Sequence, residues 1–150
     1  MRAVIQRVSS ASVSVEEAVI SSIQSGLLIF LGVEAADDPT DIEWLTRKIT
    51  SLRIFEDPEG RMNRSLLDTG GSALVISQFT LHASTRKGNR PSFIRAAPSE
   101  HSEPLYEQFC AVLSAHLERE VERGRFGAMM GVSLVNDGPV TILIDSRNRE

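Results

Sequence analysis

The longest apolar run of the chain spans Gly26 to Val33 and limits the possible folds more than any other feature. Eight residues are far too few for a membrane-spanning helix, which needs about 20 apolar residues. A short run that begins with a glycine, and has a second glycine near its end, is typical of a strand buried on both faces. The run therefore predicts a buried strand within a globular fold.

Shorter segments predict the elements around this strand. Runs rich in Val and Ile predict further strands at 1–8, 11–15, 19–23, 73–76, 132–135 and 140–144. A first helix is expected after the N-cap Asp38, with Pro39 at its first position. A second amphipathic segment runs from about Pro104 to Leu117. These elements predict an α+β fold with a mostly antiparallel curled, barrel-like sheet and two main helices.

The 150 residues contain no repeat, linker or low-complexity tract, so we expect a single domain over 1–150. Hydrophobic residues make up 41% and charged residues 24% of the chain, which excludes disordered and collagen-like proteins. Because the N-terminus has no apolar stretch of signal-peptide length, we expect a cytoplasmic protein without a membrane segment.

The charge is unevenly distributed. The net charge is −4, yet the stretch between Asp68 and Glu100 holds no acidic residue and carries +4. Its basic residues are Arg86, Lys87, Arg90 and Arg95. A basic segment on an acidic protein is typical either of a local anion site or of a solvated loop, and charge alone does not separate the two.

Side chains for conventional hydrolysis are scarce. The spacings of the three histidines match no metal site, and no nucleotide-binding glycine motif occurs, so we expect neither metal nor cofactor. Ser77 and Thr80 end a predicted buried strand, and His82 follows two residues later. A Gly-x-Ser-x-Gly elbow is missing, which favours hydroxyl groups that satisfy backbone atoms over a catalytic triad.

Two segments stand out from this background. Ser77-Gln78-Phe79-Thr80-Leu81 places three polar side chains directly after an apolar strand. Asn136-Asp137-Gly138-Pro139-Val140-Thr141 places a Gly-Pro pair between two predicted strands. Since proline lacks an amide donor and adopts the cis form at low cost, such a turn can hold carbonyl oxygens outward, although a simple hairpin connection fits the spacing equally well.

With these two motifs the chain resembles the D-aminoacyl-tRNA deacylases, which remove D-amino acids from tRNA. Further matching stretches are Ile5 to Val8, Gly26 to Leu28, Arg53 to Phe55, Gly60 to Asn63, Gly88 to Phe93 and Gly124 to Phe126. Each is weak alone, but their order and spacing are specific and cover nearly the whole chain.

The resemblance implies an enzyme that cleaves the ester of D-aminoacyl-tRNA, and also glycyl-tRNA, while rejecting L-aminoacyl-tRNA. It implies catalysis by the RNA's own 2′-hydroxyl, with the backbone amides of Gln78 and Phe79 stabilising the oxyanion. Ser77 and Thr80 complete that motif, and Thr80 is in addition a candidate nucleophile. Phe126 and Met130 are expected in the pocket wall, and the basic segment is expected to contact the acceptor end of the tRNA.

The resemblance also implies a homodimer in which Gly138 and Pro139 enter the partner's active site to select chirality. Arg7 is then expected to hold this turn from behind. We expect the Gly138-Pro139 bond to be cis and to lie at the dimer interface.

The chain departs from the family pattern at three positions, His82, Ser84 and Met129, so no base is assigned to His82 by resemblance. Two alternatives remain open. One is a non-catalytic module that binds the tRNA end, and the other is a serine or threonine esterase that uses Ser77 or Thr80 with His82.

Overall fold

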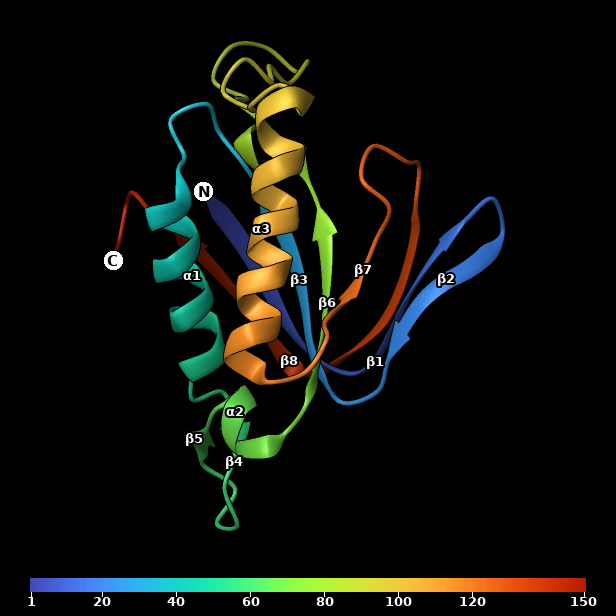
Figure 1. The fold of residues 1–150 in the computed structure, drawn as a ribbon, viewed down its shortest axis with the longest axis vertical. Helices are drawn as coiled ribbons and strands as arrows, with labels where there is room; N and C mark the ends of the chain where they lie inside the picture. Colours follow the sequence, from blue (N-terminus) through green and yellow to red (C-terminus); the bar gives the residue numbers. More distant parts are fainter.

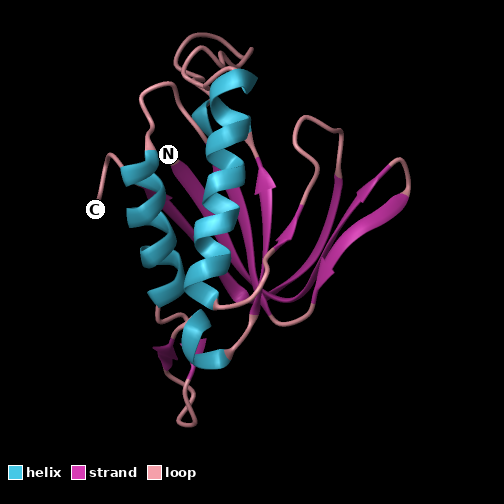
Figure 2. Ribbon diagram, viewed as in Figure 1, coloured by secondary structure: helices cyan, strands magenta, loops and turns pink.

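A curled six-stranded sheet is covered on one face by two long helices (Figures 1 and 2). The computed structural model describes residues 1–150. The sheet consists of β1 (Arg2–Val15), β2 (Ala18–Ile23), β3 (Gly26–Gly32), β6 (Ser72–Ser77), β7 (Glu122–Arg123) and β8 (Gly131–Asp145). The helices are α1 (Pro39–Ser51), the short α2 (Leu66–Thr69), the 3-10 helix η1 (Phe79–His82) and α3 (Ser99–Leu117). A separate hairpin joins β4 (Phe55–Glu56) and β5 (Met62–Arg64).

The sheet is mixed. The strand β1 runs antiparallel to β2, β3 and β8, whereas β3, β6 and β7 run parallel to one another. The parallel pairs arise because α1 lies in the connection from β3 to β6 and α3 in the connection from β6 to β7, and parallel neighbours need such crossovers. The sheet curls until β2 approaches β7, where the Ser21 hydroxyl donates to the Arg123 carbonyl oxygen at 2.6 Å.

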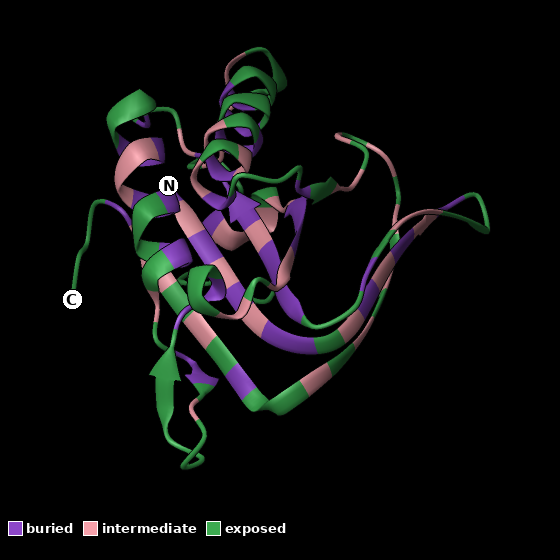
Figure 3. Cartoon of the chain, turned by 60° about the horizontal axis from the view of Figure 1, so that its bottom comes forward, coloured by how far each residue is buried: buried purple, intermediate pink, exposed green.

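The predicted buried strand is confirmed in β3. Leu27, Ile29 and Leu31 pack into the 23-residue core beneath the helices, while Leu28 packs into a seven-residue cluster on the opposite face. Figure 3 shows this burial along the sheet. The first glycine is required by a close approach, because a Cβ on Gly26 would lie 1.9 Å from the Ser72 carbonyl oxygen.

The first helix begins where the sequence predicts. Asp38 caps α1 by accepting from the Thr40 amide at 2.8 Å, and Asp41 closes the capping box. The second predicted helix, α3, begins at Ser99, so the expected start at Pro104 is wrong. Proline so close to a helix N-terminus removes a single backbone hydrogen bond, which the buried face of α3 outweighs. None of the helices is long and apolar enough to cross a membrane.

The first and last strands of the chain are longer than predicted. The segments 1–8 and 11–15 form the continuous strand β1, and the segments 132–135 and 140–144 belong to β8. Both halves of β8 pair with β1, since Val8 lies opposite Asn136 and Gln6 lies opposite Thr141. The interpretation of the Gly-Pro segment as a hairpin connection is therefore wrong. Residues 137–140 form a protrusion from one long strand.

Candidate active site

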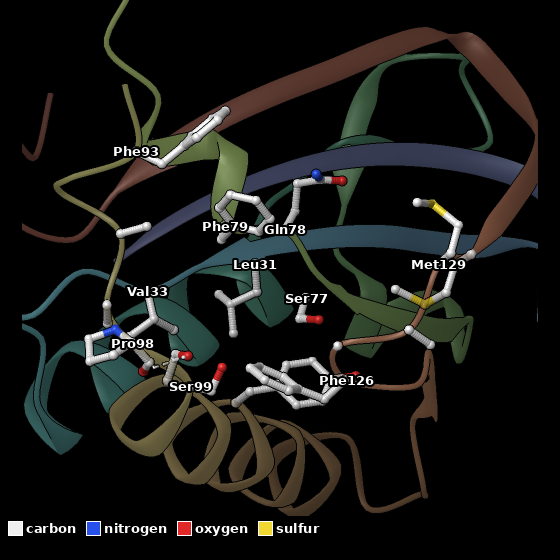
Figure 4. A pocket seen from close by; sticks show the side chains of 17 residues that line it. Leu31, Val33, Ser77, Gln78, Phe79, Phe93, Pro98, Ser99, Phe126 and Met129 are labelled. Atoms are coloured by element: carbon white, nitrogen blue, oxygen red, sulfur yellow. Dashed lines mark hydrogen bonds between the residues drawn. The ribbon is translucent and has the colours of Figure 1, made fainter. Parts of the chain in front are cut away.

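A pocket of about 690 Å³ opens beside the end of β6 (Figure 4). Its floor and walls come from the ends of β3 and β6, the first turns of α3, and the loop between β7 and β8. Eleven of its 17 lining residues are hydrophobic. Among the predicted site residues, Ser77, Gln78, Phe79, Phe126 and Met130 line it.

The strand end at the pocket offers unpaired backbone donors. The Gln78 amide donates to the Leu31 carbonyl oxygen at 2.8 Å and so continues the pairing of the sheet. The expectation that this amide is free for an oxyanion is therefore wrong. The chain then turns into η1, and the amides of Phe79 and Thr80 have no acceptor within the protein. The sequence did not show that the Thr80 amide is unpaired, because the turn into a 3-10 helix leaves no clear sequence signal.

The polar side chains of this motif bond to each other. The Gln78 side-chain amide donates to the Thr80 hydroxyl oxygen at 2.6 Å. Thr80 itself does not line the pocket, whereas Ser77 does. Neither hydroxyl has a base beside it, because both ring nitrogens of His82 lack any hydrogen-bond partner. The geometry gives no support to the esterase alternative, since a hydroxyl nucleophile needs a base within hydrogen-bond distance.

His82 is a buried residue of the fold. Its side chain is 1% exposed, and burial lowers the pKa of the imidazole below its usual value of 6.5. The ring packs against Gly32, where a Cβ would lie 3.1 Å from the His82 Cδ2 atom. The imidazole is therefore neutral at pH 7.

We expect His82→Phe to keep its catalytic rate and to be less sensitive to acid. Below pH 6.5 the unfolded chain binds a proton that the folded chain resists, so the free energy of unfolding falls as the pH falls. The contribution of one such group is at most about 1.4 kcal/mol per pH unit. Denaturant unfolding of both proteins between pH 7.5 and 5 measures the difference. A large loss of activity in a fully folded variant would instead identify His82 as a base.

Aromatic rings form the wall and rim of the pocket. The rings of Tyr106 and Phe126 lie 5.8 Å apart between centroids, and the Tyr106 hydroxyl donates to the Val75 carbonyl oxygen at 2.9 Å. This bond ties α3 to β6, and its donor was not singled out from the sequence. At the rim, Phe79 and Phe93 meet edge to face with centroids 5.1 Å apart. Met129, one of the departures from the family pattern, is 92% exposed at the mouth.

The Gly-Pro protrusion lies apart from this pocket. The Gly138-Pro139 bond is cis, as expected, and neither residue lines the pocket of its own chain. Arg7, only 5% exposed, holds the protrusion as predicted. Its guanidinium donates to the carbonyl oxygens of Asp137 at 2.8 Å and Ile54 at 2.7 Å.

The basic segment forms an exposed hairpin loop near the pocket. Ser84 and Ser92 exchange two backbone hydrogen bonds at the base of the loop, at 2.8 and 2.9 Å. Arg86, Lys87 and Arg90 lie between them, and none of the three forms an ion pair. Arg95 differs, because its guanidinium pairs with the Glu34 carboxylate at 3.2 Å. Ser84, another departure from the family pattern, takes part in these bonds only through its backbone.

Comparison with known proteins assigns the family. The family model described as D-Tyr-tRNA(Tyr) deacylase matches residues 4–145. Proteins named D-aminoacyl-tRNA deacylase from Opitutus terrae and Bacteroides fragilis are 62% and 59% identical over 150 residues, with both chains covered completely. A solved structure described as c-Myc DNA Unwinding Element Binding Protein superposes with a TM-score of 0.91 at 41% identity, covering 97% of this chain and 98% of that chain. The chain therefore belongs to the D-Tyr-tRNA(Tyr) deacylase family.

Proposed function

We propose that this protein hydrolyses the ester bond between a D-amino acid and the terminal adenosine of a tRNA. Free tRNA and the D-amino acid are the products, L-aminoacyl-tRNA is rejected, and glycyl-tRNA is a further substrate. The observation that carries the proposal is the strand end at Ser77 to Thr80, which has two unpaired amides, those of Phe79 in the pocket wall and of the adjacent Thr80, in a chain of this family.

The unpaired amides of Phe79 and Thr80 supply the electrostatic part of catalysis. When water attacks the ester carbonyl, negative charge develops on its oxygen, and fixed N–H donors stabilise that charge without reorganisation. This pair replaces the pair expected from the sequence, because the Gln78 amide is bound to Leu31. The Gln78 side chain fixes the turn by its bond to Thr80.

The RNA supplies the proton-transfer group in this proposal. The 2′-hydroxyl of the terminal adenosine is adjacent to the ester and can relay a proton between the attacking water and the leaving 3′-oxygen. No side chain of the described site offers such a group, since Ser77 and Thr80 lack a base and His82 is buried. Proximity of the 2′-hydroxyl then replaces a protein base.

A substrate that ends in 2′-deoxyadenosine should therefore be hydrolysed about a hundredfold more slowly, at the lower end of a typical proton-transfer contribution. Thr80→Ala should keep substantial activity, because the amide of residue 80 remains. Single-turnover rates on the two matched substrates measure the effect. Equal rates on both would overturn the role of the RNA hydroxyl.

The exposed hairpin loop is proposed to contact phosphates near the acceptor end. Arg86, Lys87 and Arg90 are free of acidic partners, whereas Arg95 has to leave Glu34 before it can contribute. Each cation that contacts a single strand adds about 0.7 to the slope of log affinity against log salt. We expect Arg86→Glu/Arg90→Glu to raise KM and to lower this slope by about 1.4. An unchanged KM and slope would make the segment an ordinary solvated loop.

Homodimerisation is supported by the outer edge of β8. This 15-residue strand pairs only with β1, so its other edge is unpaired, and Val135 and Leu143 are 57% and 65% exposed. Long unpaired edges with apolar side chains are rare in monomers. A dimer would let the Gly138-Pro139 protrusion of one subunit enter the pocket of the other. There it would block the position of an L-side chain while leaving space for the hydrogen of glycine.

The proposal is tested by release of D-tyrosine and L-tyrosine from the same tRNA. We expect rapid release of the D-isomer and rates near the uncatalysed background for the L-isomer. Tight binding of the tRNA end without release would favour the non-catalytic alternative. Equal release of both isomers would contradict selection by chirality.

A further inference from the structure

A basic hollow, separate from the pocket, lies at the other end of the helix layer. It has a volume of about 340 Å³ and is lined by Trp44, Arg47, Lys48, Ser51, Leu52 and Arg53. Three of its six residues are cationic and none is acidic. The sequence did not reveal the hollow, because four residues separate Arg53 from the Arg47-Lys48 pair and only the folded chain places all three around one depression.

Two of the three lining cations of the hollow have no acidic partner. Lys48 and Arg53 are exposed and form no ion pair, and the Arg53 guanidinium makes one bond, to the Asn63 carbonyl oxygen at 3.0 Å. Arg47 is partly neutralised by Glu43 at 2.6 Å. The guanidinium of Arg149 lies 4.3 Å from the centroid of the Trp44 ring and adds a fourth cation beside the hollow.

The pocket and the hollow lie toward opposite ends of α1. Val33 lines the pocket, and the Asp37 carbonyl oxygen, just before α1, lies 3.2 Å from the Nε2 atom of His101 in α3. The N-terminal end of α1 therefore lies beside the pocket, and residues of its C-terminal half line the hollow. Figure 1 shows the two ends of this helix. Thirteen helical residues span about 20 Å.

We propose that this hollow binds phosphates of the tRNA acceptor stem, as a second RNA contact apart from the pocket and the hairpin loop. The inference rests on the proposed function. A separation of about 20 Å, the length of α1, is short compared with a tRNA, so a tRNA whose 3′ end enters the pocket has further backbone phosphates within reach of the hollow. On a chain of net charge −4, a cluster of cations that includes Lys48 and Arg53 without acidic partners is the surface that such a polyanion prefers.

The test uses Lys48→Gln/Arg53→Gln with two substrates, D-tyrosyl-tRNA and D-tyrosyl-adenosine. The second substrate has no stem. We expect kcat/KM on the tRNA to fall about tenfold at 50 mM salt, and its slope against log salt to fall by about 1.8 for two lost contacts. Activity on D-tyrosyl-adenosine should equal that of the wild type, because neither residue belongs to the pocket.

A matched control is Val19→Glu/Ser22→Glu, which makes the same change in net charge at exposed positions of β2. It should leave both substrates unaffected. If the control loses as much as the hollow variant, or if the hollow variant keeps its salt slope on tRNA, the proposed contact is wrong. Wild-type protein that hydrolyses neither substrate would contradict the proposed function instead.

Discussion

Phe79→Pro should lower kcat by about 10²–10³-fold, the loss expected for one oxyanion donor, in addition to the rise in KM that loss of the ring causes. The Phe79 amide has no acceptor in the protein, so its removal breaks no hydrogen bond of the fold. Phe79 is also the first residue of η1, a position where the fixed φ of proline fits. The preceding Gln78, at φ −143° and ψ 83°, is outside the helical region that proline disfavours before it.

The control for this variant is Phe79→Ala, which removes the ring but keeps the amide. The ring is 56% exposed and contacts Phe93 at the pocket rim, so its loss should mainly raise KM. Single-turnover rates under saturating enzyme separate the two variants, and thermal unfolding verifies that both are folded. Equal kcat values for the proline and alanine variants would show that the Phe79 amide does not act on the reacting ester.

The sequence predicted the elements better than their connections. The buried strand at Gly26 to Gly32 and the cap of α1 were predictable because local patterns determine them. The parallel pairing of β3 with β6 was not, since strand direction depends on crossovers that a short strand does not encode. In the same way, the two halves of β8 looked like separate strands, because only the pairing partner β1 makes them one.

In the candidate site, too, the local motif was predictable and the tertiary contacts of its residues were not. The resemblance indicated the motif from Ser77 to Thr80, but the availability of each amide depends on sheet register. Gln78 lies one residue beyond Ser77, the last residue paired with β3, and its amide still reaches Leu31. The hold of Arg7 on Asp137 was predictable only through the resemblance, since the two residues are 130 positions apart. The basic hollow at α1 could be recognised only in the folded structure, where the helix places its cations together.

Two inactive variants should together restore activity if each site is shared between subunits. Gly138→Val alters the protrusion, because Gly138 has φ +144° and a Cβ there would lie 2.7 Å from Cγ2 of Val140. Phe79→Pro alters the pocket and leaves the protrusion intact. We expect homodimers of either variant to be nearly inactive and still folded.

A heterodimer of these two variants, purified with a different tag on each subunit, distinguishes the two arrangements. One of its sites combines an intact pocket with the partner's intact protrusion, so it should recover about half of the wild-type activity per dimer. The reciprocal control pairs a wild-type subunit with a subunit carrying both substitutions. In that dimer every site has one altered part, so it should be inactive.

If each protrusion instead served the pocket of its own chain, the reciprocal control would be active and the mixed heterodimer inactive. The wild-type subunit of the control would then keep its full site. The pocket of the single chain already favours the shared arrangement, because Gly138 and Pro139 do not line it and Arg7 fixes the protrusion on the β1–β8 pair. In the proposed arrangement, the second subunit brings this protrusion to the L-side chain that the pocket excludes.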